Sequence, residues 1–149
     1  MIVPEKLKRN DTKEVISCMG IVSCIKNNNI YVALLKDKNN CWVIPKGHLE
    51  KNESYVDATI REIKEETHID INSNEFIGKV DEYKYYSDLE NVEKLIKIYL
   101  FKINNLQNIV PLVEENFIDG KWVILEEAIQ KCTYQEQKNA LKKINILLK

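Results

Sequence analysis

Five charged residues lie close together between residues 47 and 69, in the segment GHLEKNESYVDATIREIKEETHI. They are four glutamates and one arginine: Glu53, Arg61, Glu62, Glu65 and Glu66. On a helix with 3.6 residues per turn, Glu62 lies near Glu65 and Glu66, so the three carboxylates project from nearly the same side. Like charges at this spacing repel one another unless a cation lies between them, and Mg²⁺ prefers carboxylate oxygens. The spacing therefore predicts a metal-binding helix face; the alternative is an ordinary solvated helix face.

The same segment carries the signals of an amphipathic helix that would position these carboxylates. Ser54 is a typical N-cap residue, and Asp57 adds negative charge to the first turn. An apolar stripe recurs at helical spacing in Val56, Ile60 and Ile63. We expect the helix to end near Thr67 and His68, and residues 46–53 before it to form a loop.

Apolar runs separated by polar turns predict the strands around this helix. One hairpin is expected from residues 14–25 and 30–35, and a second from residues 76–86 and 93–103. Short strands are expected at the ranges 41–44 and 121–124. Residues 111–120 read as a loop, and the polar residues 1–12 as a loose arm or an edge strand.

Two further helices are expected at the C-terminal end of the chain. The first covers residues 125–131, and the second begins at a capping box formed by Thr133 and Glu136. Several strands, one central helix and two later helices predict a mixed sheet covered on both faces. Without an internal repeat or linker, residues 1–149 are expected to form a single domain.

Composition gives no sign of a membrane or nucleic-acid partner. The net charge of −1 produces no overall field that would attract a polyanion, so an anionic substrate must be attracted locally. The charged start of the chain does not resemble a secretory signal, and no run of about 18 apolar residues occurs. The four cysteines form no Cys-x-x-Cys motif, and reduced thiols are expected. These features predict a cytoplasmic protein.

The spacing of the charged segment resembles the Nudix box, G-x5-E-x7-R-E-U-x-E-E-x-G-U, where U is aliphatic. The matching positions are Gly47, Glu53, Arg61, Glu62, Ile63, Glu65, Glu66 and Ile69. One defined position differs, since His68 stands where the box has glycine. The resemblance implies the Nudix fold, an α/β/α sandwich of the α/β (α+β) class with a mixed β-sheet between helices.

The resemblance also implies hydrolysis of a pyrophosphate bond in a nucleoside diphosphate linked to another group, with Mg²⁺ or Mn²⁺. It implies metal ligands at Glu62, Glu65 and Glu66. The backbone of Gly47 would lie close to the metal and the phosphates. Either Glu62 or Glu66 would be the general base, and Arg61 would pair with Glu53 to fix the start of the helix. A further glutamate is expected in the loop before the last strand, at Glu115 or, as the alternative, Glu114.

His68 stands at the end of the predicted helix, where a left-handed backbone conformation is common. Histidine is one of the few residues besides glycine that occur there, at a cost of about 1 kcal/mol. The departure from the box therefore concerns local stability more than chemistry, and replacement by glycine is expected to preserve or raise stability. A role for His68 as catalytic base is the rarer alternative.

Candidate substrate contacts lie on both sides of the box. Lys46 and His48 are expected to bind phosphate, although loop lysines are mostly just solvated. Among three strand tyrosines, Tyr85 is the candidate for stacking on a base; the alternative is ordinary packing. The segment Pro45-Lys46-Gly47-His48 is similar to that of asymmetrical diadenosine tetraphosphate hydrolases.

A small nucleotide, and above all a dinucleoside or other nucleoside polyphosphate, is therefore the expected substrate. ADP-ribose, an oxidised nucleoside triphosphate and an RNA 5′ end are alternatives, and the last is less favoured because no basic stripe is visible. A domain that senses a nucleotide without cleaving it would be expected to lack some box carboxylates. All of them are present here, which favours an enzyme.

Overall fold

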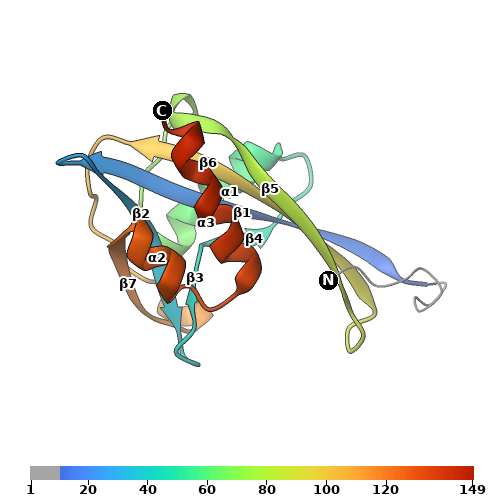
Figure 1. Ribbon diagram of the computed structural model, residues 1–149. Helices are drawn as coiled ribbons and strands as arrows, with labels where there is room; N and C mark the ends of the chain where they lie inside the picture. The colour runs from blue at the N-terminus through green and yellow to red at the C-terminus, as the bar shows by residue number, and fades with distance from the viewer. Residues whose placement is uncertain (1–10) are drawn as a thin grey trace.

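The computed structural model describes residues 11–149, and its elements follow the predicted order (Figure 1). The strands are β1 (Lys13–Lys26), β2 (Asn29–Asp37), β3 (Trp42–Val43), β4 (Lys46–His48), β5 (Phe76–Ser87), β6 (Val92–Ile103) and β7 (Phe117–Ile124). The helices are α1 (Tyr55–Thr67), α2 (Leu125–Lys131) and α3 (Gln135–Leu147), with short 3-10 turns η2 (Ser73–Glu75) and η3 (Val113–Glu115). The predicted arm or edge strand at 1–12 falls almost entirely outside the described residues.

Seven strands form one mixed sheet in the order β3-β2-β1-β6-β5, with β4 also paired to β1 and β7 to β2. Both predicted hairpins are present, as antiparallel pairs β1–β2 and β5–β6. The two hairpins join through a parallel pairing of β1 with β6, from Lys13 opposite Val92 to Cys24 opposite Ile103. Parallel strands are usually buried on both faces and read as continuous apolar runs, which is how β1 reads.

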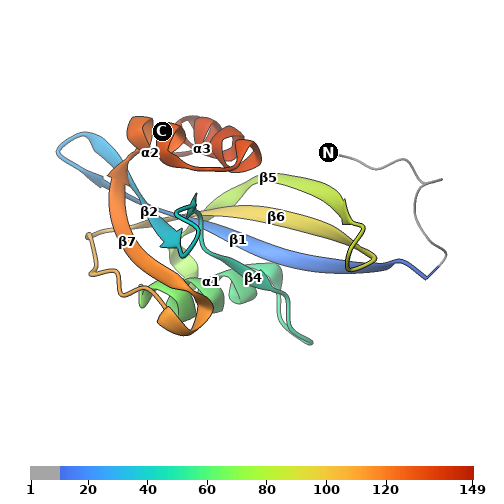
Figure 2. The same cartoon turned by 90° about the horizontal axis from the view of Figure 1, so that it is seen from below.

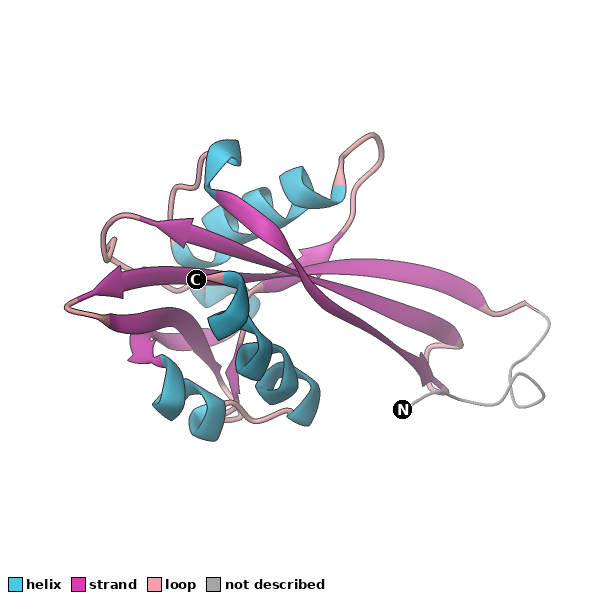
Figure 3. Cartoon of the chain, turned by 45° about the horizontal axis from the view of Figure 1, so that its top comes forward, coloured by secondary structure: helices cyan, strands magenta, loops and turns pink. Residues whose placement is uncertain are grey.

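Helices cover both faces of the sheet, and the predicted α/β/α sandwich is confirmed. Figure 2 shows α1 on one side of the sheet and α2 with α3 on the other. Successive residues of β1 point to opposite faces. Met19 and Ile21 therefore pack in the core cluster that includes α2 and α3, whereas Cys18 and Val22 pack in the cluster that includes α1. Figure 3 shows that β1, β5 and β6 extend beyond the helices at one end.

Two predicted loops are partly wrong because strand pairing extends into them. The range 46–53 contains β4, whose residues Lys46, Gly47 and His48 lie opposite Met19, Cys18 and Ser17 of β1. The range 111–120 contains η3 and the first part of β7, which begins at Phe117 and not at residue 121. Both strands pair with partners far away in the sequence, which a local pattern does not reveal.

The predicted capping box of the last helix is also wrong. Tyr134 is the N-cap residue of α3, and its side chain makes no capping hydrogen bond. Thr133 instead joins this end of the helix to β3: its Oγ1 accepts from the backbone N–H of Trp42 at 3.0 Å, and its own N–H donates to the Trp42 carbonyl at 3.0 Å. No helix among residues 11–149 is long and apolar enough to cross a membrane.

Candidate active site

Helix α1 buries two of its three box glutamates and exposes the third. As predicted, Ser54 caps the helix, with its Oγ accepting from the Asp57 N–H at 3.0 Å. Glu62 and Glu66, four residues apart, lie on the face that packs toward the sheet, with 8% and 3% of their surface exposed. The side chain of Glu65 is 48% exposed. The structure therefore brings Glu62 and Glu66 into the interior and leaves Glu65 at the rim.

Arg61 connects the helix to the loop before it. Its Nε donates to Glu53 Oε2 at 2.7 Å and its Nη2 to Glu53 Oε1 at 3.0 Å, which is the predicted forked pair. Its Nη1 donates to Glu62 at 2.7 Å and to Glu65 at 3.3 Å, and its Nη2 also reaches the His48 carbonyl at 3.1 Å. The hydrogen bonds from Arg61 lower the pKa of the Glu53 carboxyl group. The same bonds raise the pKa of the Arg61 guanidinium group.

Strand β4 supports both buried carboxylates. A Cβ atom on Gly47 would lie 1.9 Å from Cδ of Glu62, so only glycine leaves room for this carboxylate. The neighbouring backbone N–H of Lys46 donates to Glu66 Oε1 at 3.1 Å. The reason for glycine at position 47 is therefore visible: the Glu62 carboxylate rests directly on the backbone of β4.

The end of α1 is joined to the loop that carries Glu115. The last carbonyls of a helix have no partner within it. Here the Glu66 carbonyl accepts from the Leu112 N–H at 3.1 Å, and the Thr67 carbonyl accepts from the Val110 N–H at 2.9 Å. The chain then turns through η3, where Glu115 lines the same cleft as Glu66 and raises the pKa of the Glu66 carboxyl group. The structure thus brings Glu115, the preferred candidate, to the buried pair.

Burial raises the pKa of both buried carboxyl groups, Glu62 and Glu66. Burial, the hydrogen bond to Glu115 and the charges of Glu62 and Glu115 raise the pKa of Glu66 to about 9. Burial also raises the pKa of Glu62, against the opposing effect of Arg61. Carboxylates crowded in this way can all ionise only when a cation neutralises them.

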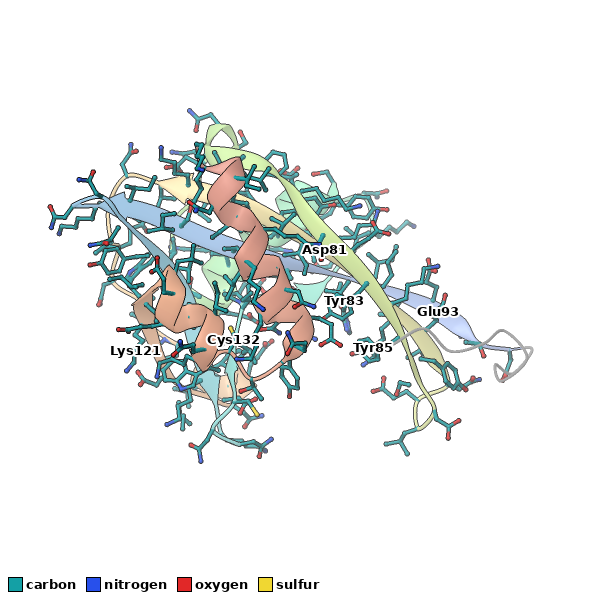
Figure 4. All side chains as sticks on the ribbon, viewed as in Figure 1. Asp81, Tyr83, Tyr85, Glu93, Lys121 and Cys132 are labelled. Atoms are coloured by element: carbon teal, nitrogen blue, oxygen red, sulfur yellow. The ribbon has the colours of Figure 1, made fainter. Side chains whose placement is uncertain are left out.

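A cleft of about 770 Å³ opens beside these carboxyl groups. Glu66, Glu115 and Lys46 line one part of it, and Tyr83 and Tyr85 of β5 line another. The two tyrosine rings are stacked, with centroids 6.3 Å apart and planes inclined by 20°. Figure 4 shows the two tyrosines following one another along β5, near the end of α3. The cleft therefore combines acidic groups, a lysine and aromatic rings.

Comparison with known proteins identifies the family. The sequence model described as the NUDIX domain matches residues 19–144, which is most of the chain. The chain belongs to the Nudix family. As a Nudix hydrolase, it is a pyrophosphohydrolase of nucleotide substrates, as the resemblance implied, and hydrolases of this family generally use divalent metal ions.

Curated relatives of this Nudix chain include hydrolases of different nucleotides. It is 34% identical to the bis(5′-nucleosyl)-tetraphosphatase (asymmetrical) of Caenorhabditis elegans over 107 residues, 72% of this chain and 75% of that protein. It is 28% identical to the RNA pyrophosphohydrolase of Pelagibacter ubique, over 72% of this chain and 75% of that protein. The crystal structure of C. elegans Ap4A hydrolase in a binary complex has a TM-score of 0.72 at 26% identity, over 90% of this chain and 97% of that chain.

The donor set of this Nudix site fits a hard divalent cation. Within residues 11–149, no three acidic, histidine or cysteine side chains already converge into a complete metal cage. Mg²⁺ rarely uses such a cage, because it keeps several waters and binds one or two carboxylates together with substrate phosphates. The buried carboxyl groups of Glu62 and Glu66 and the exposed carboxyl group of Glu115 provide oxygen donors of this kind.

Two of the predicted substrate contacts line the cleft, and one does not. Lys46 and Tyr85 are among its lining residues. His48 is not; it lies on β4 opposite Ser17, and its carbonyl accepts from Arg61. His68 also lies outside the lining, which gives no support to a role as catalytic base.

Two residues near the cleft were not predicted from the sequence: Lys94, which lies outside the cleft lining and pairs with Glu90 at 3.2 Å, and Gln137 of α3, which lines the cleft. Lys94 of β6 lies opposite Tyr85 in the hairpin, with Nζ 5.9 Å from the tyrosine ring centroid. Desolvation in the cleft, and then the charge of Lys94, lower the pKa of Lys46, although much of the Lys46 surface remains exposed. The predicted hairpin register could have pointed to Lys94. Gln137 of α3, whose Oε1 accepts from the Ile44 N–H at 2.9 Å, had no local signal.

Proposed function

We propose that this chain hydrolyses a dinucleoside polyphosphate such as diadenosine tetraphosphate, with cleavage at an asymmetric position. The observation that carries the proposal is a cleft lined by buried Glu66 and exposed Glu115 together with Lys46 and the stacked rings of Tyr83 and Tyr85. Aromatic rings offer a surface for a nucleobase, and lysines offer charge for a phosphate chain. The similarity to the tetraphosphatase of C. elegans supports the same substrate class.

The protein groups have separate tasks in the proposed reaction. Glu62, Glu65 and Glu66 would hold Mg²⁺ or Mn²⁺, which would activate a water and neutralise phosphoryl charge. Glu62 or Glu66 would accept the proton of the attacking water, and Glu115 would complete the acidic cluster. Arg61 and Glu53 fix the carboxylates, and the backbone of Gly47 leaves space for them. Lys46 attracts the phosphates and Tyr85 stacks on a base. A cytoplasmic location stays part of this proposal.

The test is a panel of nucleotides incubated with Mg²⁺ and analysed by product chromatography. Diadenosine tetraphosphate should be cleaved to ATP and AMP with a higher kcat/KM than ADP-ribose or an oxidised nucleoside triphosphate. The Glu66→Gln variant should lose activity by several orders of magnitude, while Glu114→Gln, which changes an exposed carboxylate outside the cleft lining, should retain it. A higher kcat/KM for another nucleotide would overturn the substrate assignment. Tight binding without cleavage of any nucleotide would identify a sensor.

An RNA 5′ end is a second candidate substrate, because the structure gathers lysines that the sequence analysis saw as scattered. Nζ atoms of Lys36, Lys121 and Lys131 lie 5.8, 5.2 and 4.8 Å from the ring centroid of Trp42. Trp42 is next to Val43, which lines the cleft. Within residues 11–149 none of the three lysines has an acidic partner within ion-pair distance.

Salt dependence distinguishes the two substrates. If RNA is the substrate, binding of a 5′-triphosphorylated oligonucleotide should weaken steeply with salt, and Lys121→Gln should reduce the slope by about one. Lys142→Gln, an exposed change on α3, is the control. Equal affinity of wild type and Lys121→Gln for the oligonucleotide would remove the RNA candidate.

A further inference from the structure

His68 adopts the conformation that the family's glycine would adopt, and its ring has a partner. It is the C-cap residue of α1, with φ 65° and ψ 10°, and its backbone N–H donates to the Lys64 carbonyl at 3.0 Å. Its ring Nδ1 lies 2.9 Å from the carbonyl oxygen of Val110. Since a carbonyl oxygen can only accept, Nδ1 carries a proton and donates it.

The ring contact closes a row of three hydrogen bonds between α1 and the loop at residues 110–115. The other two run between backbone groups, from Val110 N–H to the Thr67 carbonyl and from Leu112 N–H to the Glu66 carbonyl. A glycine at position 68 would leave both backbone bonds in place. It would remove the hydrogen bond from the His68 ring to the Val110 carbonyl. This side-chain hydrogen bond is therefore the contact that a glycine at the same position of the box cannot make.

The loop held in this way presents Glu115. Three residues after Leu112, the η3 turn ends at Glu115, which lines the same cleft as Glu66. The exposed side chain of Val113, with 74% of its surface accessible, adds little packing to anchor the turn. The far side of the turn is held at the end of β2, where the Asn116 carbonyl accepts from the Lys38 N–H at 2.9 Å and Phe117 pairs with Asp37. The hydrogen bonds at residues 110 and 112 hold the near side of the turn to α1.

We propose that His68 is a positioning residue: its ring hydrogen bond to Val110 fixes the loop at residues 110–115 on the end of α1 and so holds Glu115 against Glu66. The proposal rests on the proposed function, because it assumes that Glu115 belongs to the catalytic acidic cluster. His68 acts through Glu115 and touches neither metal nor substrate. Histidine at this position, where the family has glycine, therefore adds a contact that supports catalysis.

Two substitutions separate the ring bond from the backbone conformation. Asparagine and glycine both adopt the left-handed conformation. The side-chain amide N–H of asparagine takes the place of the ring Nδ1–H and can donate to the same carbonyl, whereas glycine has no side-chain donor. His68→Gly should lower kcat about tenfold, the usual effect of losing a group that orients a metal ligand, with little change in KM, and His68→Asn should retain most of the wild-type kcat. If His68→Gly keeps the wild-type kcat, or if His68→Asn loses as much as His68→Gly, the side-chain hydrogen bond has no role in positioning.

A double-mutant cycle with Glu115→Gln tests the route through Glu115. If His68 acts through Glu115, then His68→Gly in the Glu115→Gln background should cost less than about twofold, because coupled residues are not additive. A second cycle with Glu114→Gln, the neighbouring exposed carboxylate, should show the full tenfold loss. If the losses of His68→Gly and Glu115→Gln multiply, His68 does not work through Glu115.

Two readouts need no turnover. Hydrogen exchange at the amides of Val110 and Leu112 should become faster in His68→Gly, because the loop opens more often. Mn²⁺ affinity, measured by calorimetry without nucleotide, should fall about tenfold in His68→Gly but not further in the double variant with Glu115→Gln. Unchanged exchange and affinity would overturn the inference even if the enzyme is active. Changed exchange and affinity in a protein that cleaves no nucleotide would instead overturn the proposed function alone.

Discussion

Arg61 forms hydrogen bonds with several different residues of the candidate site. Its guanidinium group reaches Glu53, Glu62, Glu65 and the His48 carbonyl. The planar fork can bind the Glu53 carboxylate at two points and still have N–H groups left for Glu62. A lysine carries the same charge but has a single ammonium group, so it cannot reproduce this set.

Arg61→Lys should therefore lower both stability and activity while leaving the net charge unchanged. We expect the melting temperature to fall by a few degrees and kcat/KM to fall by about 10- to 100-fold, as when other supporting groups of a metal site are lost. Thermal unfolding and initial rates give the two measurements. Lys64→Gln, which breaks only the exposed pair with Asp70, should change either value little. Wild-type rates for Arg61→Lys would show that the fork is dispensable.

At the scale of residues, sequence spacing identified the acidic cluster but not all of its surroundings. The forked pair of Arg61 with Glu53 was expected from the motif and is present. The burial of Glu66 and the exposure of Glu65 follow from how α1 rotates against the sheet, which residue types alone do not determine. Lys94 of β6 comes near Lys46 of β4 because both strands pair with β1, which residue types alone do not reveal.

At the scale of elements, helix α1 and strand β4 form one unit. The helix was predictable because its cap, apolar stripe and end all lie within 15 residues or so of sequence. Strand β4 was not predictable from the sequence, because it is only three residues long and forms by pairing with β1. Its Gly47 is also a residue that is common in loops. The contact of Gly47 with Glu62 joins the two elements.

Gly47→Ala should separate folding from catalysis. The added methyl group would displace the Glu62 carboxylate, which is the end of a flexible side chain, so the fold should survive with a small loss in melting temperature. Hydrolysis should fall about 100-fold, because a misplaced catalytic group costs that much. Gly78→Ala is the matched control, since a Cβ atom there meets nothing within 4 Å. Equal activity of the two alanine variants would show that the place of Glu62 does not matter.

At the scale of the whole molecule, the sandwich fold was predictable and its exact pairing was not. Alternation and turns predicted both hairpins, and the positions of the helices predicted two covered faces. The parallel joining of β1 to β6 across some 80 residues of sequence had no local signal. That joining matters for function, because it brings the β5–β6 hairpin, with Tyr83 and Tyr85, to the same cleft as α1.

The whole fold also carries the free-energy cost of the buried carboxyl groups. In the unfolded chain Glu66 releases its proton near its ordinary pKa of 4.5, whereas in the metal-free fold its pKa is about 9. The folded state therefore binds more protons between these values, and its stability falls as pH rises. The stabilising contribution of protonated Glu66 is complete below the lower value and is lost as pH passes the upper one.

Metal binding should reverse this dependence. We expect the melting temperature in a chelator to fall from about pH 5 to about pH 9. Because a cation binds the ionised carboxylates, the rise in melting temperature caused by Mg²⁺ should grow over the same range. In Glu66→Gln, which stays neutral and can still accept from the Lys46 N–H, the decline in a chelator should be much smaller and the Mg²⁺ effect should be lost. Glu114→Gln should behave as wild type. If the melting temperature of Glu66→Gln falls with pH as that of the wild type does, groups other than Glu66 cause the fall. If Mg²⁺ still raises the melting temperature of Glu66→Gln, the cation does not bind at Glu66.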